Sequence, residues 1–415
     1  GGGGGGGGGG GPGRGGGAFY LLYIDLDDFK QINDVYGHKT GNKVLKNVAA
    51  YWSSLLNKDD ILARIGGDEF CMILKASRYP NIENFLKNNV LNILLDGDTF
   101  GNSAENRRIL ASAGVVTFPE DGKNSDELLK HVDFAIYKAK KAGKGQYCFF
   151  DVNIKKQVLR EVELEDCVKS GLTNNWFYMV YQPQFYIAQK KLRGFESLLR
   201  FKDANGKLIS PADFIPIAEK HGMIFKIDYY VLNKVTTEFA PVVRKNPDLC
   251  VSVNISARHI CDSYFVDEVE RILKVNNFPA ECLELEITEY SYINSLDLAI
   301  KTLNQLKSMG IQLALDDFGT GYASLSILPK LPLDLIKIDK SLIDNIHTDD
   351  VARNFVEQIV NIGHSLGCNV IAEGIEAEEQ AQVLSRQDCD YIQGYLWGKP
   401  MEYAQALTLI ENNSV

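Results

Sequence analysis

Several features that mark common classes of protein are missing from this sequence. Its eight cysteines form no C-x-x-C pair and its six histidines form no H-E-x-x-H pattern, which argues against a zinc ribbon or a zincin-type protease. The formal net charge is −10, so a long nucleic acid is not an expected partner, because its phosphates require a basic surface. No apolar run approaches the length of a membrane span. The scattered cysteines indicate reduced thiols, so we expect a cytoplasmic chain, which could be the cytoplasmic part of a larger sensory or membrane protein.

Side chains are also nearly absent from the first 17 residues, which are glycine except for Pro12 and Arg14. Glycine buries nothing and loses the most backbone entropy on ordering, so this run predicts no packed element. We interpret residues 1–17 as a tag or placeholder and exclude them from fold reasoning. The remaining length suits two domains, which we place at residues 18–150 and 172–415.

Residues 151–171 are predicted to form a helix that links the two domains. Apolar residues recur among charges at 158, 159, 162, 164 and 168, and Gly171 is expected to end the helix. Such a helix could be a semi-rigid connector that transmits a signal, or a plain spacer.

Eight short apolar runs dominate the second domain. They cover residues 177–183, 192–201, 251–256, 283–288, 312–318, 335–339, 368–375 and 391–397. Most are separated by amphipathic stretches long enough for a helix, which is the pattern of strand–helix units repeated around a barrel. In such a barrel, side chains at the carboxyl ends of the strands converge on one face.

Nine polar residues lie at or just past the ends of these runs: Glu196, Asn254, Glu286, Asp316, Asp317, Lys337, Glu373, Glu376 and Gln393. Any one of them could be an ordinary loop residue, but acids within apolar runs need a partner. Oxygen donors without nearby Cys or His suit Mg²⁺ or Mn²⁺ rather than Zn²⁺. The adjacent pair Asp316 and Asp317 could serve two ions, the usual apparatus for displacement at a phosphodiester. Lys337 would add a cation beside the phosphoryl group, although a lone strand lysine can also be a snorkelling side chain.

Six segments of the second domain resemble the successive motifs of EAL-domain phosphodiesterases. They are ESL at 196–198, SVN at 252–254, EITE at 286–289, DDFGTG at 316–321, AEGIE at 372–376 and QGY at 393–395. The resemblance covers about residues 160–410 and implies a modified TIM barrel that hydrolyses cyclic di-GMP to linear pGpG with two Mg²⁺ or Mn²⁺ ions. One departure is visible, because the alanine of the family signature is Ser197 here.

The same resemblance implies a role for each matched residue. Lys337 would contact the attacking water or the phosphate, and Glu376 and Gln393 would complete the water and metal network. Glu289 would hold the loop after Asp317. The implied metal ligands are Glu196, Asn254, Glu286, Asp316, Asp317 and Glu373, and the implied dinucleotide contacts are Gln182 and Arg200.

The first domain carries a separate signal. An apolar strand over residues 19–24 ends in the acidic segment DLDD, a helix is expected to follow through Val48, and glycines at 66 and 67 fit a tight hairpin. A Gly-Gly-Asp-Glu turn by itself can be an ordinary hairpin. Asp25 with Glu69 could hold metal ions against a triphosphate, and Lys140 and Lys144 could neutralise phosphate charge.

Four segments of this domain resemble the GGDEF diguanylate cyclase family, namely DLDDFKQIND at 25–34, YGH at 36–38, RIGGDEF at 64–70 and YKAK at 137–140. The resemblance implies a palm-like, nucleotidyl cyclase α+β fold that condenses two GTP with Mg²⁺ into cyclic di-GMP across a homodimer. It implies that Asp25 and Glu69 bind metal, Asp68 lies in the catalytic turn, Asn33 reads guanine, and Lys140 and Lys144 meet phosphates.

Three departures weaken the prediction of synthesis by the first domain. The Leu-Thr-Gly-Leu segment that normally opens the family's domain is missing, and residues 1–17 stand in its place. The family's second guanine-reading residue, an aspartate, is Asn42 here, which lacks the charge that pairs best with guanine N–H donors. The product-inhibition motif lacks its arginine, since residues 57–60 read NKDD.

Taken together, the motifs predict hydrolysis of cyclic di-GMP by the second domain. The first domain is expected to bind GTP as a regulator or to be a weak or conditional diguanylate cyclase. A cyclic di-GMP receptor that signals through a partner without turnover is the main alternative, and a net diguanylate cyclase is another. Because none of the metal-binding carboxylates is missing, the sequence favours the phosphodiesterase.

Overall fold

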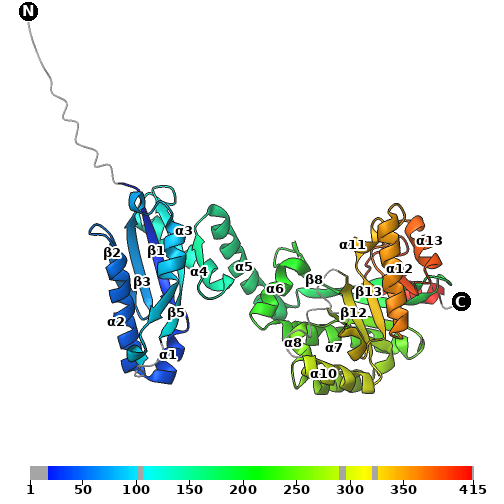
Figure 1. The fold of residues 1–415 in the computed structure, drawn as a ribbon. Helices are drawn as coiled ribbons and strands as arrows, with labels where there is room; N and C mark the ends of the chain where they lie inside the picture. Colours follow the sequence, from blue (N-terminus) through cyan, green and yellow to red (C-terminus); the bar gives the residue numbers. More distant parts are fainter. Residues whose placement is uncertain (1–16, 101–105, 289–295, 320–325, 414–415) are drawn as a thin grey trace, which may run out of the picture. The chain divides into compact units, whose positions relative to one another are not determined.

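The computed structural model describes residues 17–100, 106–288, 296–319 and 326–413, and divides into two compact units, Gly1–Val162 and Glu163–Val415 (Figure 1). Glu289, to which the sequence assigned a loop-holding role, lies outside the described residues. In the described part of the chain, no helix combines the length and the apolar character that a membrane crossing requires.

The first unit is a mixed sheet with helices on both faces. In chain order its elements are β1 (Phe19–Leu26), α1 (Phe29–Tyr36), α2 (His38–Leu55), β2 (Ile61–Gly66), β3 (Glu69–Lys75), η1 (Ala76–Arg78), α3 (Ile82–Phe85), η2 (Leu86–Val90), β4 (Asn92–Leu95), η3 (Gly97–Phe100), β5 (Arg107–Phe118), α4 (Ser125–Ala142) and β6 (Tyr147–Phe149). The strand order is β2-β3-β1-β5-β4, with β6 parallel to β5 and the other pairs antiparallel. This arrangement confirms the predicted α+β architecture.

Alternation along β1 builds two cores, one on each face of this sheet. Leu22 and Ile24 belong to the core beneath α2, whereas Leu21 belongs to the core beneath α4. This is the period-two pattern of a strand buried on both sides. Helix α4 lies so close to β5 that a Cβ on Gly114 would stand 2.4 Å from the backbone nitrogen of Ile136, so this position requires glycine.

The predicted hairpin is confirmed, because β2 and β3 pair in antiparallel register around a turn at residues 67–68. Gly67 has φ 49°, a conformation that glycine adopts without strain. The prediction of a single helix through Val48 is wrong in detail. The chain forms two helices, α1 and α2, separated at Gly37, whose φ of 81° leaves the right-handed helical region.

Helix α5 (Val152–Asn174) crosses the division between the units at Val162 and Glu163. The sequence predicted that Gly171 would end this helix, but the helix continues to Asn174. Gly171 allows close packing instead, because a Cβ there would stand 2.5 Å from the ring of Phe201.

The second unit is a barrel surrounded by helices. After α5 its elements are β7 (Phe177–Tyr186), β8 (Leu192–Lys202), β9 (Leu208–Ile209), α6 (Pro211–Lys220), α7 (Ile224–Val243), β10 (Cys250–Asn254), α8 (Ala257–Ile260), α9 (Phe265–Asn276), η4 (Ala280–Cys282), β11 (Leu283–Thr288), α10 (Leu296–Ser308), β12 (Gln312–Phe318), η6 (Leu328–Lys330), β13 (Leu335–Ile338), α11 (Lys340–Ile343), α12 (Asp350–Ser365), β14 (Asn369–Ala372), α13 (Glu378–Arg386), β15 (Tyr391–Gln393) and α14 (Tyr403–Asn413).

Eight of the described strands close the barrel in the order β7-β8-β10-β11-β12-β13-β14-β15, and each lies within or overlaps one of the eight predicted runs. Neighbours from β8 to β15 pair in parallel, whereas β7 runs antiparallel to both β8 and β15. Only residues 187–191 separate β7 from β8, which is too short for a crossover helix. The fold is therefore a modified TIM barrel, as predicted.

Candidate active site

Lys337 on β13 stands at the centre of the polar cluster. Its Nζ lies 2.7 Å from Glu286 Oε2, 2.8 Å from Glu373 Oε1, 3.1 Å from Asp316 Oδ1 and 3.5 Å from Glu196 Oε1. The Lys337 side chain is 1% exposed, so it is not a snorkelling lysine. Carboxylates from β8, β11 and β12 and from the residue after β14 therefore converge on one buried ammonium group.

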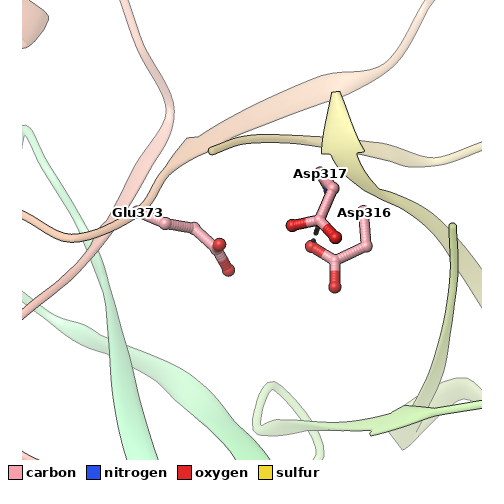
Figure 2. Close-up of side chains that lie close together, drawn as sticks. All are labelled: Asp316, Asp317 and Glu373. Carbon is pink, nitrogen blue, oxygen red and sulfur yellow. Dashed lines mark hydrogen bonds between the residues drawn. The ribbon is translucent and has the colours of Figure 1, made fainter. Parts of the chain in front are cut away.

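A β-bulge brings Asp316 and Asp317 to the same place. The register between β12 and β13 shifts between Leu315 and Phe318, so β12 carries one extra residue. Asp317 takes φ 57° there. In a regular strand these successive side chains would point to opposite faces. Figure 2 shows both at the end of β12, with Glu373 directed toward them from a separate segment, and the three side chains each offer an oxygen within 4.8 Å of the others.

The cluster carries more negative charge than Lys337 can balance. Burial raises the pKa of Glu286 well above its usual range, raises that of Glu373 to about 8 and raises that of Asp317 to about 6. Burial alone would also raise the pKa of Glu196, but Lys337 and hydrogen bonds from Gln393 and Asn254 outweigh it and lower this pKa. Further cations would relieve the repulsion among these carboxylates.

The donor set fits divalent metal ions. Glu286 Oε1 is buried and accepts no hydrogen bond from any described residue, so this oxygen can ligate a cation. Asp316, Asp317 and Glu373 likewise offer carboxylate oxygens, the ligand atoms that Mg²⁺ and Mn²⁺ prefer.

Glu196 on β8 is held from both sides by amides. Asn254 Nδ2 donates to Glu196 Oε1 at 2.9 Å, and Gln393 Nε2 donates to Glu196 Oε2 at 2.6 Å. Gln393 Nε2 also lies 3.2 Å from Gln182 Oε1. The fold thus brings these four predicted site residues together, and in this arrangement Asn254 and Gln393 present their NH₂ groups to Glu196.

An open cleft of about 510 Å³ lies over the cluster and is lined by Gln182, Glu196, Leu198, Asp316, Lys337, Lys340, Glu373, Gly374, Glu376, Gln393, Gly394 and Tyr395. Glu376 stands at its rim and forms an ion pair with Lys340. Lys340 was not predicted, although it lies two residues after the end of β13 and is therefore placed where barrel residues usually act.

Arg200 lines a second cavity of about 530 Å³ together with Leu198, Asn254 and an apolar wall that includes Pro211 and Ile227. Leu198 lies between this cavity and the cleft, because it lines both. The departure from the family motif, Ser197, has a plain structural account. Its hydroxyl donates to the carbonyl of Ser252 on the neighbouring strand at 2.6 Å.

In the first unit, the predicted residues gather at the ends of β1 and β3. Asp25 and Glu69 are partners in the antiparallel ladder, and Lys140 Nζ lies 2.6 Å from Asp25 Oδ2. Burial raises the pKa of Asp25 even though Lys140 opposes the shift. Lys144 forms an ion pair with Asp28. Both predicted phosphate-binding lysines thus contact acidic side chains of the same site.

The other predicted positions lie nearby. Asn33 packs on Gly41, where a Cβ would stand 1.9 Å from the Asn33 side-chain oxygen. Asn42 lines a cleft of about 350 Å³ with Lys46, Arg64 and Phe70. Asp68 lies in the hairpin turn, and Arg64 braces that turn by donating to the carbonyl of Gly67 at 2.9 and 2.7 Å.

Comparison with known proteins connects these two sites to families. The EAL domain family matches residues 165–400, and the family described as diguanylate cyclase, GGDEF domain, matches residues 13–146. The chain is 34% identical over 381 residues to cyclic di-GMP phosphodiesterase PdeR of Escherichia coli (strain K12), covering 92% of this chain and 57% of that protein. It is 33% identical over 393 residues to bifunctional diguanylate cyclase/cyclic di-GMP phosphodiesterase MucR of Pseudomonas aeruginosa. That match covers 94% of this chain and 57% of MucR.

A solved structure, PaMucR Phosphodiesterase in a c-di-GMP complex, superposes with a TM-score of 0.56 at 33% identity and covers 59% of this chain and 99% of that one. The chain spans only 57% of the length of PdeR and of MucR. Both domain families are nevertheless matched in the expected order. The chain belongs to the family of proteins in which a GGDEF domain is followed by an EAL domain.

Proposed function

We propose that the barrel hydrolyses cyclic di-GMP to linear pGpG with two divalent metal ions. The observation that carries the proposal is the convergence of Asp316, Asp317 and Glu373 beside buried Lys337. The printed names of PdeR and MucR, both called cyclic di-GMP phosphodiesterases, support the choice of substrate.

The residues that would hold Mg²⁺ or Mn²⁺ are Glu196, Asn254, Glu286, Asp316, Asp317 and Glu373, with Gln393 completing the network. Bound ions would neutralise the carboxylates, lower the pKa of an attacking water and stabilise charge on the phosphodiester. The bulge at Asp317 is what allows neighbouring aspartates to serve two ions.

The protein's own groups would position the reactants. Lys337 is a buried donor that can hold the attacking water or a phosphate oxygen. Glu373 lines the cleft 2.8 Å from Lys337 Nζ, so its metal-bound carboxylate would help Lys337 to orient the attacking water. Glu376 at the rim would order water with Lys340.

The two neighbouring hollows suit the two parts of a nucleotide. The cleft over the acidic cluster would take the scissile phosphodiester, with Gln182 beside Glu196 as a hydrogen-bonding contact. The cavity that Arg200 lines is mostly apolar and would take a base, while the Arg200 guanidinium would pair with a phosphate. Glu289 would support the loop that follows Asp317.

For the first domain we propose binding of Mg²⁺ and GTP, with regulation of the barrel or weak and conditional diguanylate cyclase activity. Asp25 and Glu69 would bind the metal, and Asp68 would belong to the catalytic turn between β2 and β3. Asn33 and Asn42 would contact guanine, and Lys140 and Lys144 would leave their carboxylates to meet the phosphates. We also propose a homodimer and a cytoplasmic location.

The test is to incubate purified protein with cyclic di-GMP and Mg²⁺ or Mn²⁺, with and without GTP, and to follow pGpG by chromatography. Production of pGpG that Glu196→Ala and Asp316→Ala abolish without loss of fold is expected, and faster production with GTP would assign a regulatory role to the first domain. Unchanged activity in either variant would refute the site. Tight binding without product would make the chain a receptor, and net accumulation of cyclic di-GMP from GTP would make it a cyclase.

A further inference from the structure

A buried ion pair lies inside the barrel, two hydrogen bonds away from the active-site amide of Gln393. Arg193 on β8 and Glu284 on β11 are 5% and 0% exposed, and their side chains form two contacts, NH2 to Oε2 at 2.5 Å and NH1 to Oε1 at 3.3 Å. Ser252 Oγ donates to the same carboxylate at 2.7 Å. Arg193 NH1 also donates to Gln184 Oε1 at 2.5 Å.

A second β-bulge explains how Arg193 reaches the interior. Gln184 pairs with Gly194 and Phe185 pairs with Leu192, so Arg193 is the extra residue on β8 and has no partner on β7. A bulge re-aims the side chain of the extra residue. The side chain of Arg193 therefore meets Gln184 and Glu284 inside the barrel, although it is an odd number of residues away from Glu196.

The hydrogen bonds in this network have a fixed direction. A guanidinium group can only donate, so Gln184 must accept with its carbonyl oxygen. The NH₂ of Gln184 then donates to Gln393 Oε1 at 2.9 Å. That contact engages the carbonyl of Gln393, so its NH₂ donates to Glu196 Oε2 at 2.6 Å. Each amide orientation follows from the one before it.

We propose that Arg193, held by Glu284, is a positioning residue that acts through Gln184 to make Gln393 a hydrogen-bond donor to the metal-binding carboxylate Glu196. Glu196 favours the same orientation of Gln393 from its own end, because an ionised carboxylate only accepts hydrogen bonds, and Arg193 fixes it from the other end through Gln184. The inference rests on the proposed function only in that Glu196 is a metal ligand. In this role Gln393 acts on the metal through Glu196, because groups that orient a ligand tune its affinity.

The sharpest test breaks the network with an isosteric change. In Gln184→Glu the new carboxylate still accepts from Arg193, but it cannot donate to the Gln393 carbonyl and instead competes with Glu196 for the Gln393 NH₂. Mn²⁺ binding, measured from the electron paramagnetic resonance signal of free Mn²⁺, is expected to weaken by about tenfold or more. In the hydrolysis assay kcat should fall while KM for cyclic di-GMP changes little, because Gln184 is not one of the described residues that line the cleft.

Two further variants separate positioning from structure. Tyr181 lies on β7, as Gln184 does, and its hydroxyl contacts Glu238. As a structural control, Tyr181→Phe removes that contact and should lower the melting temperature while leaving the Mn²⁺ affinity unchanged. Arg193→Met should weaken Mn²⁺ binding, whereas Arg193→Lys, which keeps a donor-only cation, should retain most of it.

A folded Gln184→Glu protein with wild-type Mn²⁺ affinity would overturn the inference. If that variant does not fold, equal affinities of Arg193→Met and Arg193→Lys would overturn it instead. Loss of Mn²⁺ affinity in Gln184→Glu, in a chain whose wild type makes no pGpG, would uphold the network and refute the proposed hydrolysis.

Discussion

Replacing Lys337 by methionine tests the electrostatics of the barrel most severely. The change keeps much of the side-chain volume but removes the ammonium group, which has four carboxylates within 3.5 Å of Nζ. Removing one partner of a buried ionic cluster costs ~3–5 kcal/mol, because the remaining charges lose their compensation. For a domain of this size each kcal/mol lowers the melting temperature by ~2–4 °C, so we expect a fall of about 6–20 °C in EDTA.

Divalent ions should reverse much of this loss, because they supply the missing positive charge. Thermal unfolding of Lys337→Met is therefore expected to respond more strongly to Mg²⁺ or Mn²⁺ than that of the wild type, when both are followed by circular dichroism. The matched control is Lys340→Met. Its side chain is 45% exposed and pairs with Glu376 at the rim, so the expected cost is below about 1 kcal/mol. Equal melting temperatures for the wild type and Lys337→Met in EDTA would refute the reasoning.

Three more predictions concern pH, packing and nucleotide binding. Burial raises the pKa of Glu373 to about 8 and that of Asp317 to about 6, so the folded metal-free barrel binds protons that the unfolded chain releases and should lose stability as the pH rises toward 8. Since protons compete with metal, the rise in melting temperature on adding Mg²⁺ should be larger at pH 8 than at pH 6, and a rise independent of pH would contradict this account. Gly171→Leu should destabilise the barrel by ~1–3 kcal/mol in urea titrations, because a Cβ at Gly171 would meet Phe201 at 2.5 Å. An undiminished unfolding midpoint would refute that packing argument. Asn42→Asp should tighten binding of a fluorescent GTP analogue severalfold, because a carboxylate pairs better with guanine N–H donors, and equal or weaker binding would remove Asn42 from the nucleotide site.

Hydrophobic pattern predicted the strands well. Each barrel strand is a short apolar run, and the run from Leu283 to Thr288 coincides with β11 residue for residue. Burial on both faces makes most positions of such a strand apolar, so its limits are visible in the sequence. The polar residues inside β11, Glu284 and Glu286, each pair with a buried cation instead. The polar residues within these strands or just past them converge as expected, because the carboxyl ends of parallel strands share one face.

Local irregularities could not be predicted from the same pattern. The bulge at Asp316 and Asp317 and the bulge at Arg193 each insert one residue, and nothing in the period of the apolar residues reveals them. Gly37 and Gly171 look alike in sequence, yet one separates two helices and the other permits a close contact within a helix. Tertiary contacts, which the sequence does not display, decide between these outcomes.

Arg193 shows what a closer inspection of the sequence could have revealed. It interrupts the apolar run at residues 192–201, as does the acid at 284 in its own run. Two opposite charges inside separate buried strands require each other, so the pair itself could be inferred. Its connection to Gln393 could not, because it depends on side-chain positions across the barrel.

If the acidic cluster is a metal-dependent phosphodiesterase centre, turnover of cyclic di-GMP must stop when the metal is removed. The most direct measurement is the initial rate of pGpG formation from cyclic di-GMP by the EDTA-stripped protein, as Mg²⁺ or Mn²⁺ is titrated back. We expect no product without metal and full recovery of the rate when metal is added, and we expect no recovery in Asp317→Asn. Turnover that does not depend on divalent metal, or saturable binding of cyclic di-GMP that yields no pGpG at any metal concentration, would contradict it.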